Sequence, residues 1–152
     1  MDTEKLLKLL KEHKVKFVII GATAFPIHGY ARATLDIDIF IRSTPDNARR
    51  TWQALKEFGY DMTDVKIEDL LTKKLLIRQY MVEIDIHPFV KGVKFNEVWK
   101  NKVRAKYKNT YVYFASLNDL IKMKKAANRE KDQEDLKYLM KAKRLKISDK
   151  KK

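Results

Sequence analysis

The feature that most constrains the fold of this chain is an alternation of acidic and aliphatic residues in two short segments. Residues 35–41 read Leu-Asp-Ile-Asp-Ile-Phe-Ile, and residues 82–86 read Val-Glu-Ile-Asp-Ile. Side chains two residues apart on a β-strand point to the same side of the sheet, with Cα atoms about 6.5–7 Å apart. Each segment is therefore predicted to be a strand that buries its aliphatic face and gathers its carboxylates on the other face.

The remaining patterns predict a mixed α/β domain. Apolar residues at helical spacing, with start and stop signals such as Thr44-Pro45 and Gly59, predict helices over residues 3–13, 22–30, 44–58, 116–128 and 131–143. Short β-branched or alternating runs predict strands over residues 15–20, 35–41, 75–80 and 82–86, and a strand pair within residues 102–114. This order favours a central mixed β-sheet flanked by helices, with two C-terminal helices.

Length and composition set the class of protein. The chain has 152 residues, of which 45% are hydrophobic, so we expect a single domain over residues 1–145 and a basic tail over residues 146–152. The lack of cysteine excludes a disulfide scaffold, a thiolate zinc site and a cysteine nucleophile. Neither a secretory signal nor a membrane-spanning apolar run is visible, so a cytoplasmic protein is expected.

The net charge of +14 is concentrated in the last third of the chain. Residues 1–99 carry a net charge of +2, and residues 100–152 carry +12. Such an excess favours a polyanionic partner, although a solvated lysine-rich surface gives the same count. Lysines outnumber arginines by 26 to 8, and arginine is the residue that reads guanine edges, so sequence-specific readout of a duplex is not expected.

The alternating strands predict a metal site. Asp36 and Asp38 share one strand face, where paired carboxylates favour a cation such as Mg²⁺. A solvated edge strand is the alternative. Asp85 is a better third ligand than Glu83, because Ile84 and Ile86 flank Asp85 and Glu83 is nearer the start of the strand. Three carboxylates on adjacent strands suit two ions about 3.5–4 Å apart that clamp the attacking and leaving oxygens of phosphoryl transfer, and Asp85 could take the proton from an attacking hydroxyl.

A possible phosphate site lies at the end of the first strand. Gly21 ends that strand, and the helix expected after it would present free N–H groups to an anion. Because proline is best tolerated in the first helical turn, Pro26 places the helix start near Thr23 or Ala24. Thr23 is then a candidate cap or phosphate ligand.

These residues resemble a known family. Residues 18–41, and within them Arg32-Ala33-Thr34-Leu35-Asp36-Ile37-Asp38, resemble the nucleotidyltransferase fold of the DNA polymerase beta-like superfamily, especially its small bacterial and archaeal members. Asp85 matches the third acid of that family. The helix over residues 117–124, followed by Arg129-x-x-Asp132, is similar to the family's C-terminal pattern. The resemblance covers about residues 15–140.

The resemblance implies transfer of a nucleoside monophosphate from a nucleoside triphosphate, such as ATP, to an acceptor hydroxyl. Asp36 and Asp38 would hold two Mg²⁺ ions, and Asp85 would hold the catalytic ion and activate the acceptor. The segment Gly21-Ala22-Thr23 would cradle the β and γ phosphates.

Three further residues are candidate phosphate contacts. Arg32 and Thr34 precede the acidic strand, although both also fit structural roles, and Lys124 could neutralise triphosphate charge. His28 is interpreted as a packed or capping residue, and His87 as a residue that could approach the site from a strand end.

The acceptor and the activity itself stay open. Family members usually have Gly-Ser or Gly-Gly where this chain has Gly21-Ala22, which keeps the backbone donors but lacks the serine hydroxyl. The alternative function is therefore an inactive module that binds nucleotide or a partner protein. The resemblance is compatible with RNA (tRNA in toxin-type members), a partner protein as in toxin–antitoxin pairs, or a small molecule such as an antibiotic as acceptor. The charge of residues 100–152 favours RNA.

Overall fold

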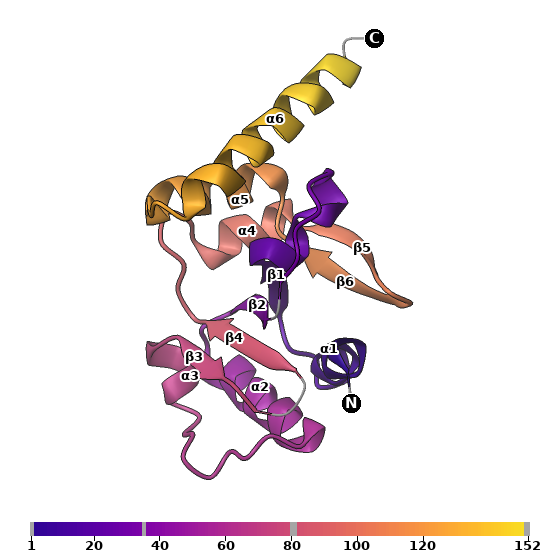
Figure 1. Cartoon of the computed structure of the whole chain (residues 1–152). Helices are drawn as coiled ribbons and strands as arrows, with labels where there is room; N and C mark the ends of the chain where they lie inside the picture. Colours follow the sequence, from indigo (N-terminus) through magenta and orange to yellow (C-terminus); the bar gives the residue numbers. More distant parts are fainter. Residues whose placement is uncertain (1, 35, 80–81, 151–152) are drawn as a thin grey trace.

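The computed structural model describes residues 2–34, 36–79 and 82–150 (Figure 1). Within these residues, six strands form one mixed sheet in the order β3-β4-β2-β1-β6-β5. The strands are β1 (Phe17–Ile20), β2 (Asp36–Ile41), β3 (Leu75–Ile77), β4 (Glu83–His87), β5 (Val103–Tyr107) and β6 (Thr110–Phe114). The mixed sheet with flanking and C-terminal helices confirms the predicted fold class.

The pairing of the strands places the acidic segments side by side. β2 is parallel to β4 on one side and antiparallel to β1 on the other. The crossover from β2 to β4 includes α2 (Pro45–Phe58), α3 (Asp69–Thr72) and the antiparallel strand β3. At the far side of the sheet, β6 is parallel to β1 and forms the predicted hairpin with β5.

The helices cover the sheet and complete the core. They are α1 (Thr3–Glu12), α2, α3, α4 (Phe95–Asn101), α5 (Leu117–Ala127) and α6 (Asp132–Lys150). α1 packs against α2, and α5 packs against α6, whose last turns extend beyond the rest of the chain (Figure 1). Phe25, Phe40, Phe58 and Phe114 are fully buried in a core that includes residues from every strand except β5.

Helix boundaries follow the capping signals in the sequence. Thr44 caps α2 by accepting a hydrogen bond from the amide of Asn47, and Gly59 ends the helix with a φ of 116°. Ser116 caps α5 in the same way through the amide of Asp119. The short helices α3 and α4 were not predicted, and neither has a side-chain N-cap to mark its start.

The helix predicted over residues 22–30 is wrong. Two short 3₁₀ helices occupy this segment, η1 (Gly21–Ala24) and η2 (Pro26–His28). Pro26 lacks the N–H that an α-helix would need there, and the segment instead uses i to i−3 bonds such as Phe25 N–H to Ala22 O, 3.2 Å. No α-helix therefore starts after β1 to supply a dipole for an anion.

Other boundaries differ less. The segment predicted as a strand over residues 75–80 is a strand only at Leu75–Ile77 in its described part, and Leu35, Tyr80, Lys151 and Lys152 lie outside the described residues. α6 runs through the start of the proposed tail to Lys150. The division into residues 1–145 and 146–152 stays a prediction.

Candidate active site

The acidic strands meet in register at the centre of the sheet. Asp38 on β2 is the direct partner of Asp85 on β4, and Asp36 is the partner of Glu83. Because β2 and β4 are paired in parallel and residues two apart share a face, these four carboxylates and His87 lie on the same side of the sheet. The predicted proximity of Asp36, Asp38 and Asp85 follows from this pairing.

Asp38, Asp85 and His87 form a group of potential metal ligands. One ligand atom from each lies within 4.8 Å of the others. His87 Nε2 lies 2.8 Å from Asp38 Oδ1, and Asp85 is 5% exposed. The sequence predicts His87 only as a residue that could approach the site, although the alternation of Glu83 and Asp85 along the strand continues to it.

Arg78 neutralises the exposed end of the acidic face. Its guanidinium lies 2.5 Å from Asp85 Oδ1, and 3.5 Å from both Asp36 Oδ2 and Glu83 Oε2. The hydrogen bond with Asp85, and then the nearby carboxylates, raise the pKa of Arg78. Asp36 thus lies one register step from the Asp38–Asp85 pair and faces an arginine that the sequence analysis did not single out.

The backbone of Gly21 passes directly beside Asp38. Gly21 has a φ of +70°, and a Cβ atom there would lie 2.6 Å from Asp38 Oδ2, closer than van der Waals contact allows. A cavity of about 310 Å³ opens at this point, and Gly21, Ala22, Arg32, Thr34 and Lys124 are among its lining residues. Thr23 is not among them.

Two buried aspartates of α6 hold the basic wall of this cavity, which consists of Arg32, Lys124 and Arg129. Asp132 and Asp135 are 1% and 3% exposed. Lys124 Nζ lies 3.1 Å from Asp132 and 3.2 Å from Asp135, and Arg129 also pairs with Asp132 at 2.7 Å. Although burial alone would raise it, hydrogen bonds from Arg129 and Lys124 hold the pKa of Asp132 far below its usual range.

Asp135 fixes the side of the wall nearest β2. It accepts hydrogen bonds from Arg32 at 2.7 Å and from the hydroxyl of Tyr30 at 3.0 Å. Burial, and then the Asp135 carboxylate, raise the pKa of Tyr30 to about 12, so this hydroxyl stays a donor. Thr34 instead donates its hydroxyl to the backbone carbonyl of Asp36, 2.9 Å away.

A family model described as nucleotidyltransferase of unknown function (DUF6036) matches residues 1–148. The chain belongs to this family. The crystal structure of a candidate nucleotidyltransferase from Thermotoga maritima has the same fold, with a TM-score of 0.55 and 16% sequence identity over 98% of this chain and 91% of that one. The search of curated proteins returned no match.

The donor set of this nucleotidyltransferase fits a divalent cation. Mg²⁺ and Mn²⁺ both bind carboxylate oxygens, and Mn²⁺ binds an imidazole nitrogen more readily than Mg²⁺ does. Asp38 and Asp85 bring oxygens from paired strands to one point, and Asp36 adds a further carboxylate to the same cavity.

Of the helices in the described part of the nucleotidyltransferase, none has the length and apolar character needed to cross a membrane.

Proposed function

We propose that this nucleotidyltransferase moves a nucleoside monophosphate from a nucleoside triphosphate to an acceptor hydroxyl. The observation that carries the proposal is the direct pairing of Asp38 with Asp85 across from a wall of ion-paired cations. A carboxylate face and a cationic wall in one cavity match the two needs of the reaction, which are a divalent cation at the reacting phosphate and charge neutralisation of the leaving pyrophosphate.

The acidic face serves the reacting phosphate. Asp36, Asp38 and Asp85 would hold two Mg²⁺ ions, which when bound supply charge stabilisation at the phosphoryl group. His87 contacts Asp38 and so orients its carboxylate. Asp85 accepts the proton of the acceptor hydroxyl as the bond from that oxygen to the α phosphorus forms. The bond from the α phosphorus to its bridging oxygen breaks, and pyrophosphate leaves with the electron pair.

The basic wall serves the leaving group. Lys124, Arg32 and Arg129 are held in place by Asp132 and Asp135, so their positions are set before substrate binds. Such preorganised cations stabilise charge that develops in the transition state. Gly21 and Ala22 line the same cavity, and their amides are proposed to contact the β and γ phosphates, whereas Thr23 has a weaker claim because it does not line the cavity.

One observation favours the alternative of a module that binds nucleotide or a partner protein without turnover. Ala22 lines the cavity at the position where the resembling family carries Ser or Gly, so no hydroxyl is available there. Binding of a nucleoside triphosphate without any transfer would support this alternative.

The test is transfer of label to total RNA. The wild-type protein is incubated with Mg²⁺ and each of the four ribonucleoside triphosphates in turn, labelled at either the α or the γ phosphate. We expect the α label to enter RNA and the γ label to be released as pyrophosphate. Asp38→Asn is the matched control, because it keeps the shape of the side chain and removes its charge. Transfer that persists undiminished in this variant contradicts the proposed site.

A further inference from the structure

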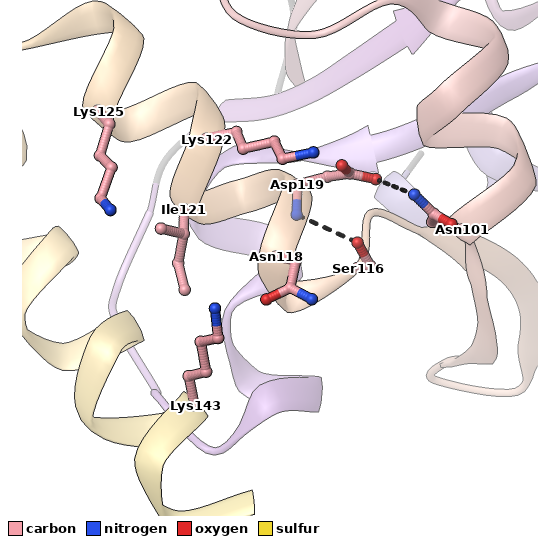
Figure 2. Close-up of a pocket in the computed structure, with 8 residues that line it drawn as sticks. All are labelled: Asn101, Ser116, Asn118, Asp119, Ile121, Lys122, Lys125 and Lys143. Atoms are coloured by element: carbon pink, nitrogen blue, oxygen red, sulfur yellow. Dashed lines mark hydrogen bonds between the residues drawn. The ribbon is translucent and has the colours of Figure 1, made fainter. Parts of the chain in front are cut away.

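A second and larger cavity lies against another face of α5, away from the acidic site. It has a volume of about 580 Å³, is open to solvent on one side and is bordered by α5, the end of α4 and the middle of α6 (Figure 2). Its polar lining includes Asn101, Asn118, Asp119, Lys122, Lys125 and Lys143. None of these residues lines the acidic cavity.

The three lysines of this cavity have no ionic partner among the residues that the structure describes. Within the described part of the chain, none of their ammonium groups forms an ion pair or a hydrogen bond. Lys122 and Lys125 are three residues apart and share a helix face, which differs from the face that carries Lys124 to the acidic cavity. α5 therefore presents a neutralised lysine on one side and free lysines on the other.

Asp119 adds an acceptor that lacks a donor. It is fully buried, and its Oδ2 accepts a hydrogen bond from Asn101 at 3.3 Å (Figure 2). No described residue donates to its Oδ1. Leaving a buried polar atom unpaired costs about 1–3 kcal/mol, so a shift of the lining that admitted a hydroxyl or amine to this solvent-closed oxygen would be favoured.

A ribose-phosphate chain satisfies both features. Lysine ammonium groups bind phosphate as point charges on flexible stems, and a ribose 2′-hydroxyl can donate to a carboxylate oxygen. A DNA strand offers the phosphates but lacks that hydroxyl. The surrounding part of the chain, residues 100–152, carries a net charge of +12, which attracts a polyanion over a longer range.

We propose that this cavity binds the ribose-phosphate backbone of RNA and holds the acceptor strand beside the active site. The two cavities lie on different faces of one helix, whose diameter with side chains is about 10–12 Å, so a strand bound in one can reach the other. The RNA-binding claim stands on the lysines and Asp119. The acceptor role rests in addition on the proposed nucleotidyl transfer.

The test measures binding of a fluorescent single-stranded RNA of mixed sequence, and of DNA of the same sequence, by anisotropy over a series of salt concentrations. The variant is Lys122→Gln with Lys125→Gln. Its matched control is Lys5→Gln with Lys8→Gln, which removes two exposed lysines at the same spacing from α1. We expect the first pair to weaken RNA binding about 10-fold or more and to lower the salt slope by about 1–2, while the control stays within about 2-fold of wild type.

Three results would overturn the proposal: no RNA binding by the wild type, equal losses in the two lysine pairs, or displacement of RNA by AMP at an equal concentration of phosphate. Equal losses would mean that only diffuse charge acts, and displacement would mean that the cavity holds a free nucleotide. Asp119→Asn is expected to narrow the preference for RNA over DNA without changing the salt slope. Asp38→Asn should bind RNA as the wild type does and lose transfer. The binding assay and the transfer assay therefore separate a failure of the proposed RNA binding from a failure of the proposed nucleotidyl transfer.

Discussion

The two cavities that share α5 differ in how their cations are held. In the acidic cavity, Lys124 and Arg129 are tied to Asp132, which is almost completely buried. In the second cavity, Lys122 and Lys125 have no partner among the described residues. Fixed cations suit a reaction in which one phosphate must be placed accurately. Free cations suit a flexible polyanion whose contacts vary along its length.

The largest expected effect comes from the carboxylate at the centre of the acidic cavity. Asp85→Asn should reduce nucleotidyl transfer by about 10²- to 10³-fold, because it would remove a proposed metal ligand and the proposed proton acceptor together. Initial rates at saturating nucleoside triphosphate measure this loss. Glu83→Gln is the matched control, since Glu83 lies on the same strand face and is 40% exposed at its side chain. A loss of the same size in both variants would show that general charge, and not the Asp38–Asp85 pair, supports transfer.

A smaller loss of nucleotidyl transfer activity is expected from Gly21→Ala. The new Cβ would press on Asp38 at a backbone φ of +70°, and we expect activity to fall about 10- to 10²-fold as the carboxylate moves. Gly29→Ala is the control for backbone strain alone, because its φ is +92° and a Cβ there meets no atom of the described chain within 4 Å. Rates and thermal midpoints of both variants are compared. If Gly29→Ala lost as much activity as Gly21→Ala, the contact with Asp38 would have no special role.

Removing one anchor of the basic wall should affect substrate affinity more than turnover. Asp135→Asn removes the ionic partner of Arg32 and one of the two ionic partners of Lys124, so we expect the KM for the nucleoside triphosphate to rise about 10-fold, and the free energy of unfolding to fall by about 1–3 kcal/mol. Steady-state kinetics and urea unfolding measure the two effects. Glu134→Gln changes the exposed neighbour and should alter neither. An unchanged KM in Asp135→Asn would contradict a role for the wall in binding phosphate.

The smallest expected effect is a change in stability with pH that depends on His28, which contacts Lys146 of α6. Its Nε2 donates to the carbonyl of Ala115 at 2.9 Å, and Lys146 lies 3.1 Å from its Nδ1. Burial lowers the pKa of His28, so below about pH 6.5 the unfolded chain binds a proton that the folded chain does not. Stability should therefore fall as the pH drops below 6.5, by at most about 1.4 kcal/mol per pH unit. Urea unfolding at pH 7.5 and 5.5 should show a smaller difference for His28→Gln, and an unchanged difference would contradict this assignment.

The alternation of acids explains why the position of the three aspartates in the sheet was predictable. Asp36, Asp38 and Asp85 follow from a period of two on strands that must bury isoleucine, and this period leaves little freedom in which face the carboxylates take. His87 obeys the same period. The fold class followed from the same patterns, whereas the short helices and the 3₁₀ turns after β1 depend on local bonds that periodicity does not encode.

The partners of the charges were not predictable in the same way. In the sequence, Asp132 and Asp135 are typical of the acidic first turn of any helix, and only the packing of α5 against α6 buries them. Arg78 follows a short strand with no periodic signal. Lys122, Lys124 and Lys125 are indistinguishable by composition, and the rotation of α5 decides which of them meets a carboxylate.

The most direct test of the account is a comparison of two variants in two assays, RNA binding and nucleotidyl transfer at limiting and saturating RNA. Asp38→Asn should bind RNA as the wild type does and fail to transfer at any RNA concentration. Lys122→Gln with Lys125→Gln should bind RNA weakly, transfer slowly at limiting RNA and recover most of the wild-type rate at saturating RNA. If each variant lost both properties to the same extent, the separation of tasks between the two sides of α5 would be contradicted.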